Sequence, residues 1–497
     1  MKIISIGSDI KLFEENSQSR VKQIEYGKLF DRVDIIVFSN KSQNFKTIQI
    51  SDNVFIHPTN SRNKLFYVFD AFNIGRKIIK EFKSDVVSTQ DPFESGLVGL
   101  KLKFLCELAL QVQVHTDFSN KYFILHSPLN VIRFIMAEVI LSFADSVRVV
   151  SDRVKKSVHN LPEHISLLPV YIPILALPTE RIYEKDAISI LTVSRLEKEK
   201  DLKTAILAFK KLIDSGISAE FIIVGDGMER KSLEDFAKNL ELSSKVIFKG
   251  WQNPQSYYSR ADIYISTSLY EGYGMSIVEA SQHASALVIS DAGISDYFVN
   301  GESAFIVKPR DVNGFADALK KLALDSDLRK KMGEKAKKIV QRNLISKEDY
   351  LNKYKGSLKE ALKVKNSGIG IFKRNILLRY FVAGFTAAFT NIFLLYVFTE
   401  FLKIWYVYSS ALSFIVALFI SFILQKFWTF ADKEITKAHR QFIRYFLVGI
   451  FGVLLNTLLI YIFVEFLGVW YILGQIFTGV IIAVINFFLY KMLIFKK

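Results

Sequence analysis

The segment EGYGMSIVE, residues 271–279, has the residue types of an anion site in this chain of 497 residues. Two glycines near its start allow backbone N–H groups to approach an anion. The N-terminus of the helix expected there adds a partial positive charge of about half a unit. Two flanking glutamates are suited to accept hydrogen bonds from sugar hydroxyls, and the alternative is an ordinary solvated helix start. The candidate for catalysis in this segment is Glu271, and the candidates for donor binding are Gly272, Gly274, Met275, Ser276 and Glu279.

A run of charges, RLEKEK at residues 195–200, directly follows the apolar run 188–194. If that run is a strand of a parallel sheet, the charges lie at its carboxyl end, where open α/β sheets bind ligands. Arg195 offers a bidentate fork for phosphate oxygens, and Lys200 offers a mobile point charge. Both residues are candidates for catalysis and donor binding, and the alternative is a solvated charge run.

A histidine, His115, ends another expected strand, QVQVH at residues 111–115. At the edge of a cleft, its imidazole can position a sugar or take part in proton transfer. We therefore consider His115 a candidate catalytic residue. The alternative is a histidine with a purely structural role.

The elements that position these residues follow from the alternation of apolar runs with helical patterns. Strands of a first lobe are expected at residues 2–7, 34–38, 85–87 and 111–115. Strands of a second lobe are expected at residues 188–194, 221–225, 246–250, 262–266 and 286–290. A loop with four prolines between residues 162 and 178 separates the two groups. This order predicts two doubly wound, Rossmann-like α/β lobes with a cleft between them.

The C-terminal quarter of the chain is dominated by four apolar stretches, at residues 380–398, 405–424, 445–464 and 467–489. Each is near the length of about 20 residues that crosses a hydrocarbon core of about 30 Å. Lysines and arginines gather before the first stretch, between the second and third, and after the fourth. The positive-inside rule then places the soluble part and both termini in the cytoplasm, on a multi-pass protein of the cell membrane.

The predicted fold is thus two α/β lobes followed by an all-α, four-helix transmembrane domain. The expected domains are residues 1–172 and 173–345 for the lobes, 346–372 for a helical linker, and 373–497 for the membrane domain.

The membrane part contains an internal repeat of 65 residues, because the tripeptide RYF at Arg379 recurs at Arg444 (444 − 379 = 65). Two spans per repeat give both copies the same orientation. The basic residues of the repeat could bind a lipid phosphate or only anchor the protein, and the asparagines could line a polar path or join helices. These candidates are Arg379, Lys426, Arg444, Lys491, Asn391 and Asn456.

Composition excludes several classes of protein. The net charge is +16, but no zinc-ligand spacing or basic recognition helix supports nucleic-acid binding, and anionic lipid and a diphosphate ligand account for the basic excess. The one cysteine, Cys106, permits neither an internal disulfide nor a thiolate metal site. The N-terminus has too short an apolar stretch for a signal peptide.

Several pieces in order, ADSVRVVS, TVSRLEKEKD, IVGDG, VIFKGW and EGYGMSIVEA, resemble family 4 of the retaining glycosyltransferases, which have the GT-B fold. The resemblance covers roughly residues 1–360. It implies that Glu271 contacts the donor sugar and Glu279 the nucleotide ribose. It also implies that the diphosphate is bound by Arg195 and Lys200, and that His115 lies near the transferred sugar.

The resemblance also makes Gly7, at the end of the first strand, a donor-binding candidate. The chain departs from the family pattern here, because Gly7 stands almost alone where a glycine-rich loop is usual. Breaking a sugar–phosphate bond develops negative charge on the diphosphate, which Arg195, Lys200 and the helix N-terminus stabilise without a metal. The nucleotide sugar is a substrate, so no cofactor is expected.

The RYF repeat and the segment SFILQKFWTF, residues 421–430, resemble the GtrA-like family of four-span proteins, which is associated with surface-polysaccharide glycosylation. The leading hypothesis is a membrane-bound, retaining hexosyl- or related transferase. It would move a sugar from a nucleotide sugar to a polyprenyl- or other lipid-linked acceptor in cell-surface polysaccharide or glycolipid synthesis. The alternative is a polyprenyl-phosphate-sugar translocator with a soluble binding or regulatory module, and a third possibility is a passive membrane anchor. A homo-oligomer through the membrane domain is also expected.

Overall fold

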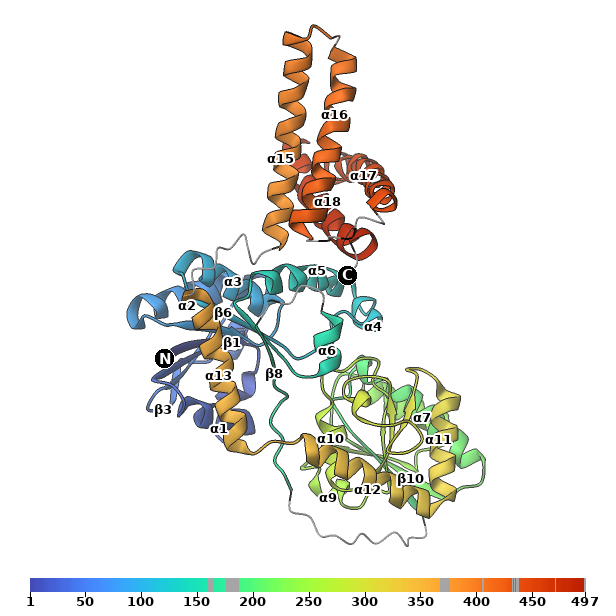
Figure 1. Ribbon diagram of the computed structural model, residues 1–497. Coiled ribbons are helices and arrows are strands. Elements are labelled where there is room, and N and C mark those ends of the chain that lie inside the picture. Colours follow the sequence, from blue (N-terminus) through green and yellow to red (C-terminus); the bar gives the residue numbers. More distant parts are fainter. Residues whose placement is uncertain are drawn as a thin grey trace. The chain divides into compact units, whose positions relative to one another are not determined.

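The computed structural model describes all residues except 159–161, 163, 176–186, 367–375, 405, 431, 433, 435–437, 470, 496 and 497 (Figure 1). The chain divides into two compact units, Met1–Ser367 and Gly368–Lys497. The first unit contains two α/β lobes, and the second is helical.

The first lobe is built on an eight-stranded sheet with the order β3-β4-β2-β1-β5-β6-β7-β8. Its strands are β1 (Lys2–Gly7), β2 (Arg32–Val37), β3 (Ile48–Ser51), β4 (Val54–Pro58), β5 (Val86–Thr89), β6 (Ala109–Val114), β7 (Ser146–Val149) and β8 (Ile165–Leu167). All neighbours pair in parallel except β3 and β4, which the sequence did not indicate. The main helices are α1 (Gln18–Gly27), α2 (Tyr67–Phe82), α3 (Glu94–Cys106) and α5 (Pro128–Phe143). Two shorter helices are α4 (Lys121–Ile124) and α6 (Asp152–Ser157).

The second lobe is built on a six-stranded parallel sheet with the order β11-β10-β9-β12-β13-β14. Its strands are β9 (Ile188–Val193), β10 (Ala219–Val224), β11 (Val246–Gly250), β12 (Ile263–Ser266), β13 (Ala286–Ser290) and β14 (Phe305–Val307). Its helices are α7 (Leu202–Asp214), α8 (Arg230–Asn239), α9 (Gln255–Tyr258), α10 (Met275–Gln282), α11 (Val312–Leu324) and α12 (Ser326–Asn343). The two lobes confirm the predicted pair of Rossmann-like folds.

Both faces of the second sheet are buried, which explains why its strands are apolar runs without polar alternation. Ile190 of β9 belongs to one core cluster, with α7 and α11, whereas its neighbour Leu191 belongs to another, with α10. Ile263 and Tyr264 of β12 divide in the same way. Successive side chains of a strand point to opposite faces, so each strand binds helices on both sides.

The helix α13 (Lys347–Asn366) is part of the first lobe's core. Tyr350, Tyr354 and Leu358 are buried in one cluster with residues of β1, β2 and β4. The sequence placed this helix in a linker. Its apolar stripe is instead covered by the first sheet, so α13 closes the lobe that contains the N-terminus (Figure 1).

The second unit has four long helices, α15 (Ile376–Tyr396), α16 (Tyr406–Ile423), α17 (Ala438–Tyr461) and α18 (Tyr471–Leu489). A π-helical segment follows each: η6 (Val397–Phe401), η7 (Leu424–Thr429), η8 (Ile462–Phe466) and η9 (Tyr490–Ile494). The segments η6 and η8 lie 65 residues apart, as the sequence repeat predicts. In the part of the chain that the structure describes, one helical stretch, Phe477–Ile494, is long and apolar enough to cross a membrane. The number of four spans therefore stays a prediction.

The repeat is also seen in side-chain contacts. Arg379 donates a hydrogen bond to the carbonyl oxygen of Trp428 (2.7 Å), and Arg444 donates to that of Leu493 (3.1 Å), each pair related by the repeat. These acceptors lie in η7 and η9, where a π-helical turn changes the usual backbone pairing. The side chain of Asn456 lies outside the described part, and Lys491 lies in η9.

Lys426 does not lie open for a lipid phosphate, which corrects that candidate. Its side chain is fully buried, and its ammonium group donates to Asp432 (2.8 Å) and Gln441 (2.7 Å). Gln441 also donates to the same carboxylate (2.7 Å). A buried ammonium group needs such a counter-charge, so Lys426 joins η7 to the start of the second repeat.

The buried position of Leu358 in α13 predicts the effect of its truncation. Leu358→Ala should lower the free energy of unfolding by about 2–5 kcal/mol, because a fully buried leucine leaves a cavity. The neighbouring exposed substitution Lys359→Ala should change it by less than about 0.5 kcal/mol. Urea unfolding of the full-length protein in detergent measures both. Equal stabilities would show that α13 is not part of the core.

Candidate active site

One cavity of about 420 Å³ brings together the functional candidates of both lobes. It lies at the carboxyl ends of β6 and β9 and at the N-terminus of α10, where open α/β sheets bind ligands. The predicted residues that line it are His115, Arg195, Lys200, Glu271, Gly272, Gly274, Met275, Ser276 and Glu279. The volume is in the range of small-molecule sites.

The loop between β12 and α10 supplies most of the second lobe's wall. Gly274 caps α10 with φ of 99°, a left-handed conformation that favours glycine. The following N–H groups of Met275 and Ser276 are in the first turn, where a helix has no backbone acceptor of its own for them. The hydroxyl of Tyr264 donates a hydrogen bond to the Oγ of Ser276 (2.7 Å) and fixes this side chain. The cavity therefore receives the positive end of a helix.

At Gly272 the loop lies directly against the first lobe. A Cβ atom at this position would overlap the carbonyl oxygen of His115, so only glycine allows the two backbones to meet. Ser151, the residue before α6, donates a hydrogen bond to the carbonyl oxygen of Gly272 (2.7 Å). The two lobes thus contact each other directly at the wall of the cavity.

Lys200 and Glu271 form an ion pair inside the cavity, with 15% and 18% of their side chains exposed. Ser268 donates a further hydrogen bond to the same Glu271 oxygen (2.9 Å). The two loops that carry this pair are joined, because Thr267 donates to the carbonyl oxygen of Lys200 (2.9 Å) and the N–H of Leu269 donates to that of Glu199 (2.8 Å). The pair is therefore preorganised by its supporting loops.

Arg195 lies at the rim of the same cavity. Its side chain is 64% exposed and pairs with Glu199 (3.1 Å), a contact of small energy at a solvated position. The loop behind it is close-packed, since a Cβ on Gly225 would overlap the carbonyl oxygen of Ser194. A rigid backbone with a mobile guanidinium group suits the capture of an anionic ligand.

Glu279 faces the cavity from the first turns of α10, and the hydroxyl of Tyr258 donates to its carboxylate (2.8 Å). Burial raises the pKa of Glu279, and the Tyr258 hydrogen bond opposes that rise. An ionised carboxylate accepts hydrogen bonds only, so it suits a ligand with hydroxyl groups.

His115 enters the cavity as a neutral group. Burial, together with the positive charge of Arg148, lowers the pKa of His115 to about 3. Its Nε2 atom lies 3.1 Å from the Oε1 atom of Gln113. At physiological pH this imidazole is uncharged, so it is suited to hydrogen bonding and does not add to the positive charge of the site.

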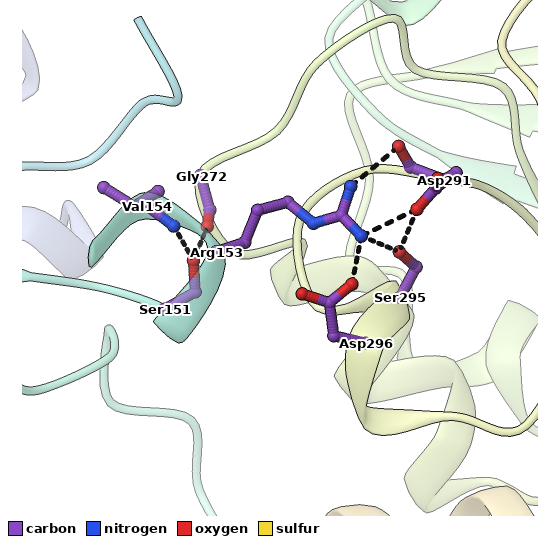
Figure 2. Close-up of polar contacts among 7 residues, drawn as sticks. All are labelled: Ser151, Arg153, Val154, Gly272, Asp291, Ser295 and Asp296. Atoms are coloured by element: carbon purple, nitrogen blue, oxygen red, sulfur yellow. Dashed lines mark hydrogen bonds and ion pairs between the residues drawn. The ribbon is translucent and has the colours of Figure 1, made fainter. Parts of the chain in front are cut away.

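A second contact between the lobes was missed by sequence reasoning. Arg153 of α6 donates to the backbone and carboxylate of Asp291 (3.0 and 2.6 Å) and to Ser295 (2.9 Å), and it forms an ion pair with Asp296 (Figure 2). Burial raises the pKa of Asp291, but the contacts with Arg153 and Ser295 together outweigh burial, and the pKa of Asp291 is lowered. The sequence does contain one indication of this contact, because Arg153 lies just after an apolar strand, at the predicted edge of the cleft.

Gly7 is placed elsewhere. It ends β1 beside Gln90, and the next residue, Ser8, lines a separate cavity of about 490 Å³ in the first lobe. That cavity combines aromatic and charged groups, namely Phe38, Tyr67, Phe93, Lys64, Arg133, Asp91 and Glu94. Gly7 is therefore nearer to this second cavity than the sequence implied.

Comparison with protein families agrees with this geometry. Residues 178–339, which contain Arg195, Lys200, Glu271 and Glu279, match the family described as glycosyl transferases group 1. Residues 379–495 match the GtrA/DPMS transmembrane domain. The chain therefore contains a group 1 glycosyltransferase domain and a GtrA/DPMS transmembrane domain.

Known relatives of this glycosyltransferase include the capsular polysaccharide biosynthesis glycosyltransferase CapM of Staphylococcus aureus. It is 22% identical over 343 residues, which cover 64% of this chain and 90% of CapM. A second relative, from Campylobacter jejuni, is named as a 4-alpha-N-acetylgalactosaminyltransferase of a diphospho-undecaprenol-linked sugar. It is 28% identical over 195 residues, or 37% of this chain and 53% of the relative.

Solved structures share the fold of the first unit, Met1–Ser367. Anabaena HepE in complex with UDP-glucose superposes with a TM-score of 0.57 and 18% identity, covering 73% of the glycosyltransferase chain and 99% of HepE. At this identity the likeness establishes the GT-B fold of two Rossmann-like lobes.

The contact at Arg153 predicts a loss of activity when the lobes are no longer held together. Arg153→Met should lower the rate of sugar transfer by about 10-fold or more, equivalent to about 1.4 kcal/mol, because both lobes line the cavity. The control Lys335→Met removes an exposed ion pair with Glu302 (3.0 Å) and should leave the rate unchanged. A folded Arg153→Met enzyme with the wild-type rate would contradict the role of this contact.

Proposed function

We propose that this glycosyltransferase moves a sugar from a nucleotide sugar to a lipid-linked acceptor in the synthesis of a cell-surface polysaccharide or glycolipid. One observation carries the proposal. A single cavity combines two cations, Arg195 and Lys200, a helix N-terminus, and two carboxylates, Glu271 and Glu279. Cations beside a helix N-terminus suit a diphosphate, and carboxylates suit hydroxyl groups. The UDP-glucose complex of HepE supports a UDP-sugar as the first donor to test.

In this proposal the diphosphate leaving group is stabilised by the protein. As the sugar–phosphate bond breaks, negative charge grows on the phosphate oxygens. Arg195 can move from Glu199 to those oxygens with little loss, because its present ion pair is exposed. Lys200 and the N–H groups at the start of α10 are already fixed at the cavity wall. We expect transfer to proceed without a divalent metal or another cofactor.

The two glutamates and the histidine are proposed to hold the sugar and the ribose. Glu271 is charge-balanced by Lys200 before substrate enters, so it remains an ionised acceptor for sugar hydroxyls. His115 is neutral, which lets its free ring nitrogen accept a hydrogen bond from the transferred sugar. Glu279, one turn further along α10, suits the ribose. The resemblance to retaining enzymes leads us to expect that the anomeric configuration is kept.

The acceptor is proposed to enter from the first lobe. The separate cavity there has an aromatic wall of Phe38, Tyr67 and Phe93, the basic residue Lys64, and Arg133, which is paired with Glu94 (2.7 Å) at a partly exposed position where a phosphate could exchange with the carboxylate. The Campylobacter relative, by its name, acts on a diphospho-undecaprenol-linked acceptor. The GtrA/DPMS match supports a membrane location for this step.

The membrane unit is proposed to be multi-pass, with the soluble unit and both termini on the cytoplasmic side, where nucleotide sugars are available. Arg379 and Arg444 stay candidates for lipid phosphate, since each donates to a helix-terminal carbonyl and not to a carboxylate. Lys426 is not proposed as a lipid-phosphate ligand, because its fully buried ammonium group is paired with Asp432. Pairing of two copies through this unit remains a proposal.

The experiment that tests the function is donor turnover by the full-length protein in membranes. UDP-, GDP-, ADP- and dTDP-sugars are supplied, and lipid products are extracted. Glu271→Gln should lower transfer by about 100-fold or more, roughly 3 kcal/mol, because it removes the charge that Lys200 and the sugar share. The exposed control Glu348→Gln should retain wild-type transfer.

The outcomes separate the alternatives. A lipid-linked product that depends on Glu271 supports the proposal and identifies the donor. If nucleotides bind but no donor is turned over, the proposal is wrong, and a translocator with a soluble binding module becomes the better account.

A further inference from the structure

Arg148 of β7 is a buried cation in the centre of the first lobe, with 3% of its surface exposed. Its guanidinium group donates to the carbonyl oxygens of Leu168 (3.0 Å) and Pro169 (2.9 Å), to Gln113 (3.0 Å), and to the hydroxyl of Tyr350 (2.8 Å). None of these partners is a carboxylate. An arginine buried among neutral acceptors is costly to keep, so its position calls for an explanation beyond charge pairing.

The amide of Gln113 on β6 is oriented by its neighbours. Its Oε1 atom accepts from Arg148, and its Nε2 atom donates to the Oγ of Ser88 (3.0 Å). Ser88 in turn donates to the Oε1 atom of Gln111 (3.2 Å). Because a guanidinium group can only donate, Arg148 requires that the Gln113 oxygen, and not the amide nitrogen, faces the guanidinium group.

The orientation of Gln113 determines the tautomer of His115. The same Oε1 atom lies 3.1 Å from Nε2 of His115, so the imidazole must carry its proton on Nε2 and donate it to Gln113. The ring nitrogen left as an acceptor is Nδ1. His115 lines the cavity, so this acceptor is the one available to a bound sugar.

We propose that Arg148 and Gln113 are positioning residues that orient His115 so that its Nε2 donates to Gln113 and its Nδ1 is left to accept a hydrogen bond from the donor sugar. This inference rests on the proposed function, because it assigns a role within the same cavity. Among the residues that the structure describes, neither Arg148 nor Gln113 belongs to the lining of that cavity.

The same network connects His115 with α13 and with the segment that leaves β8 toward the second lobe. Arg148 binds two carbonyl groups of that segment and the hydroxyl of Tyr350 in α13. A second chain runs from Gln111 to Ser357 of α13 (2.9 Å). The state of His115 is therefore tied to the packing of the helix at the end of the soluble unit.

Charged groups of both signs surround His115, and one of them, Arg148, acts on its pKa together with burial. Arg148 faces it from β7 through Gln113, and Arg195, Lys200, Glu271 and Glu279 line the same cavity from the second lobe. Burial and the charge of Arg148 lower its pKa. Removal of Arg148 should therefore raise the pKa toward the ordinary value and release the Gln113 amide to rotate.

The test is nuclear magnetic resonance of the full-length protein in nanodiscs with ¹⁵N-labelled histidine, which reports tautomer and protonation directly. The chain has 7 histidines, and His115→Gln assigns the signal. In the wild type we expect the Nε2-protonated form with no titration between about pH 5 and 8. In Arg148→Met we expect a mixture of the two neutral tautomers of His115 and a His115 pKa higher than in the wild type.

A matched control is available in the second lobe. Arg329 is another buried arginine that donates to carbonyl oxygens, those of Leu322 (2.6 Å) and Ala323 (3.1 Å), and Arg329→Met should leave the His115 signal unchanged. If Arg148→Met does not fold, Gln113→Glu replaces it as the test. Its carboxylate can only accept, so the tautomer should persist while the pKa of His115 rises.

Activity is measured in parallel with the donor that the wild type uses. Arg148→Met should lower kcat by about 10-fold or more, as loss of a histidine-orienting partner does at other sites. A folded Arg148→Met or Gln113→Glu protein whose His115 signal titrates as in the wild type would overturn the inference. The spectra need no donor, so the expected spectral change in Arg148→Met, found together with a wild-type protein that turns over no donor, would count against the proposed function and not against this inference.

Discussion

The approach of two backbones, at Gly272 and His115, is the constraint on which the active site depends. Gly272 belongs to the second lobe and His115 to the first, and a side chain at the glycine would overlap the histidine carbonyl. Ser151, the residue before α6, donates to the carbonyl oxygen of Gly272. Arg153 of α6 binds Asp291 and so adds a further contact between the two lobes. A cavity with walls from both lobes exists only while this approach is kept. The interlobe contacts therefore shape the candidate active site as well as the architecture.

Charge within the cavity is arranged so that the empty site is balanced. Lys200 neutralises Glu271, and Arg195 is loosely paired with Glu199 at the rim. In the proposed function, a diphosphate would draw Arg195 from Glu199, while Lys200 stays fixed between Glu271 and the diphosphate. His115 contributes no charge, because burial and Arg148 keep it neutral. In the proposed function, the site would exchange the exposed Arg195–Glu199 ion pair for a substrate contact, which limits the cost of binding a dianionic group.

Sequence reasoning found what is local in the chain. Glu271, Gly274 and Ser276 belong to one loop and helix start, and strand ends located Lys200 and His115, so the cavity could be anticipated from short segments. Arg148 and the contacts of α13 could not, because their partners lie more than about 20 residues away and only the folded sheet brings them together. The role of Gly7 in donor binding stays a prediction. A motif expectation placed it at the donor, whereas the sheet places the next residue at the separate cavity.

The most direct test of the account is calorimetric titration of UDP, GDP, ADP and dTDP into full-length protein carrying Gly272→Ala. The control is Gly356→Ala, in α13, where an added Cβ meets no atom within 4 Å. The account predicts that the nucleotide bound by the wild type binds Gly356→Ala equally well. It should bind Gly272→Ala at least about 10-fold more weakly, a loss of about 1.4 kcal/mol. Unchanged affinity in a folded Gly272→Ala protein would show that the donor site does not depend on the meeting of the two lobes.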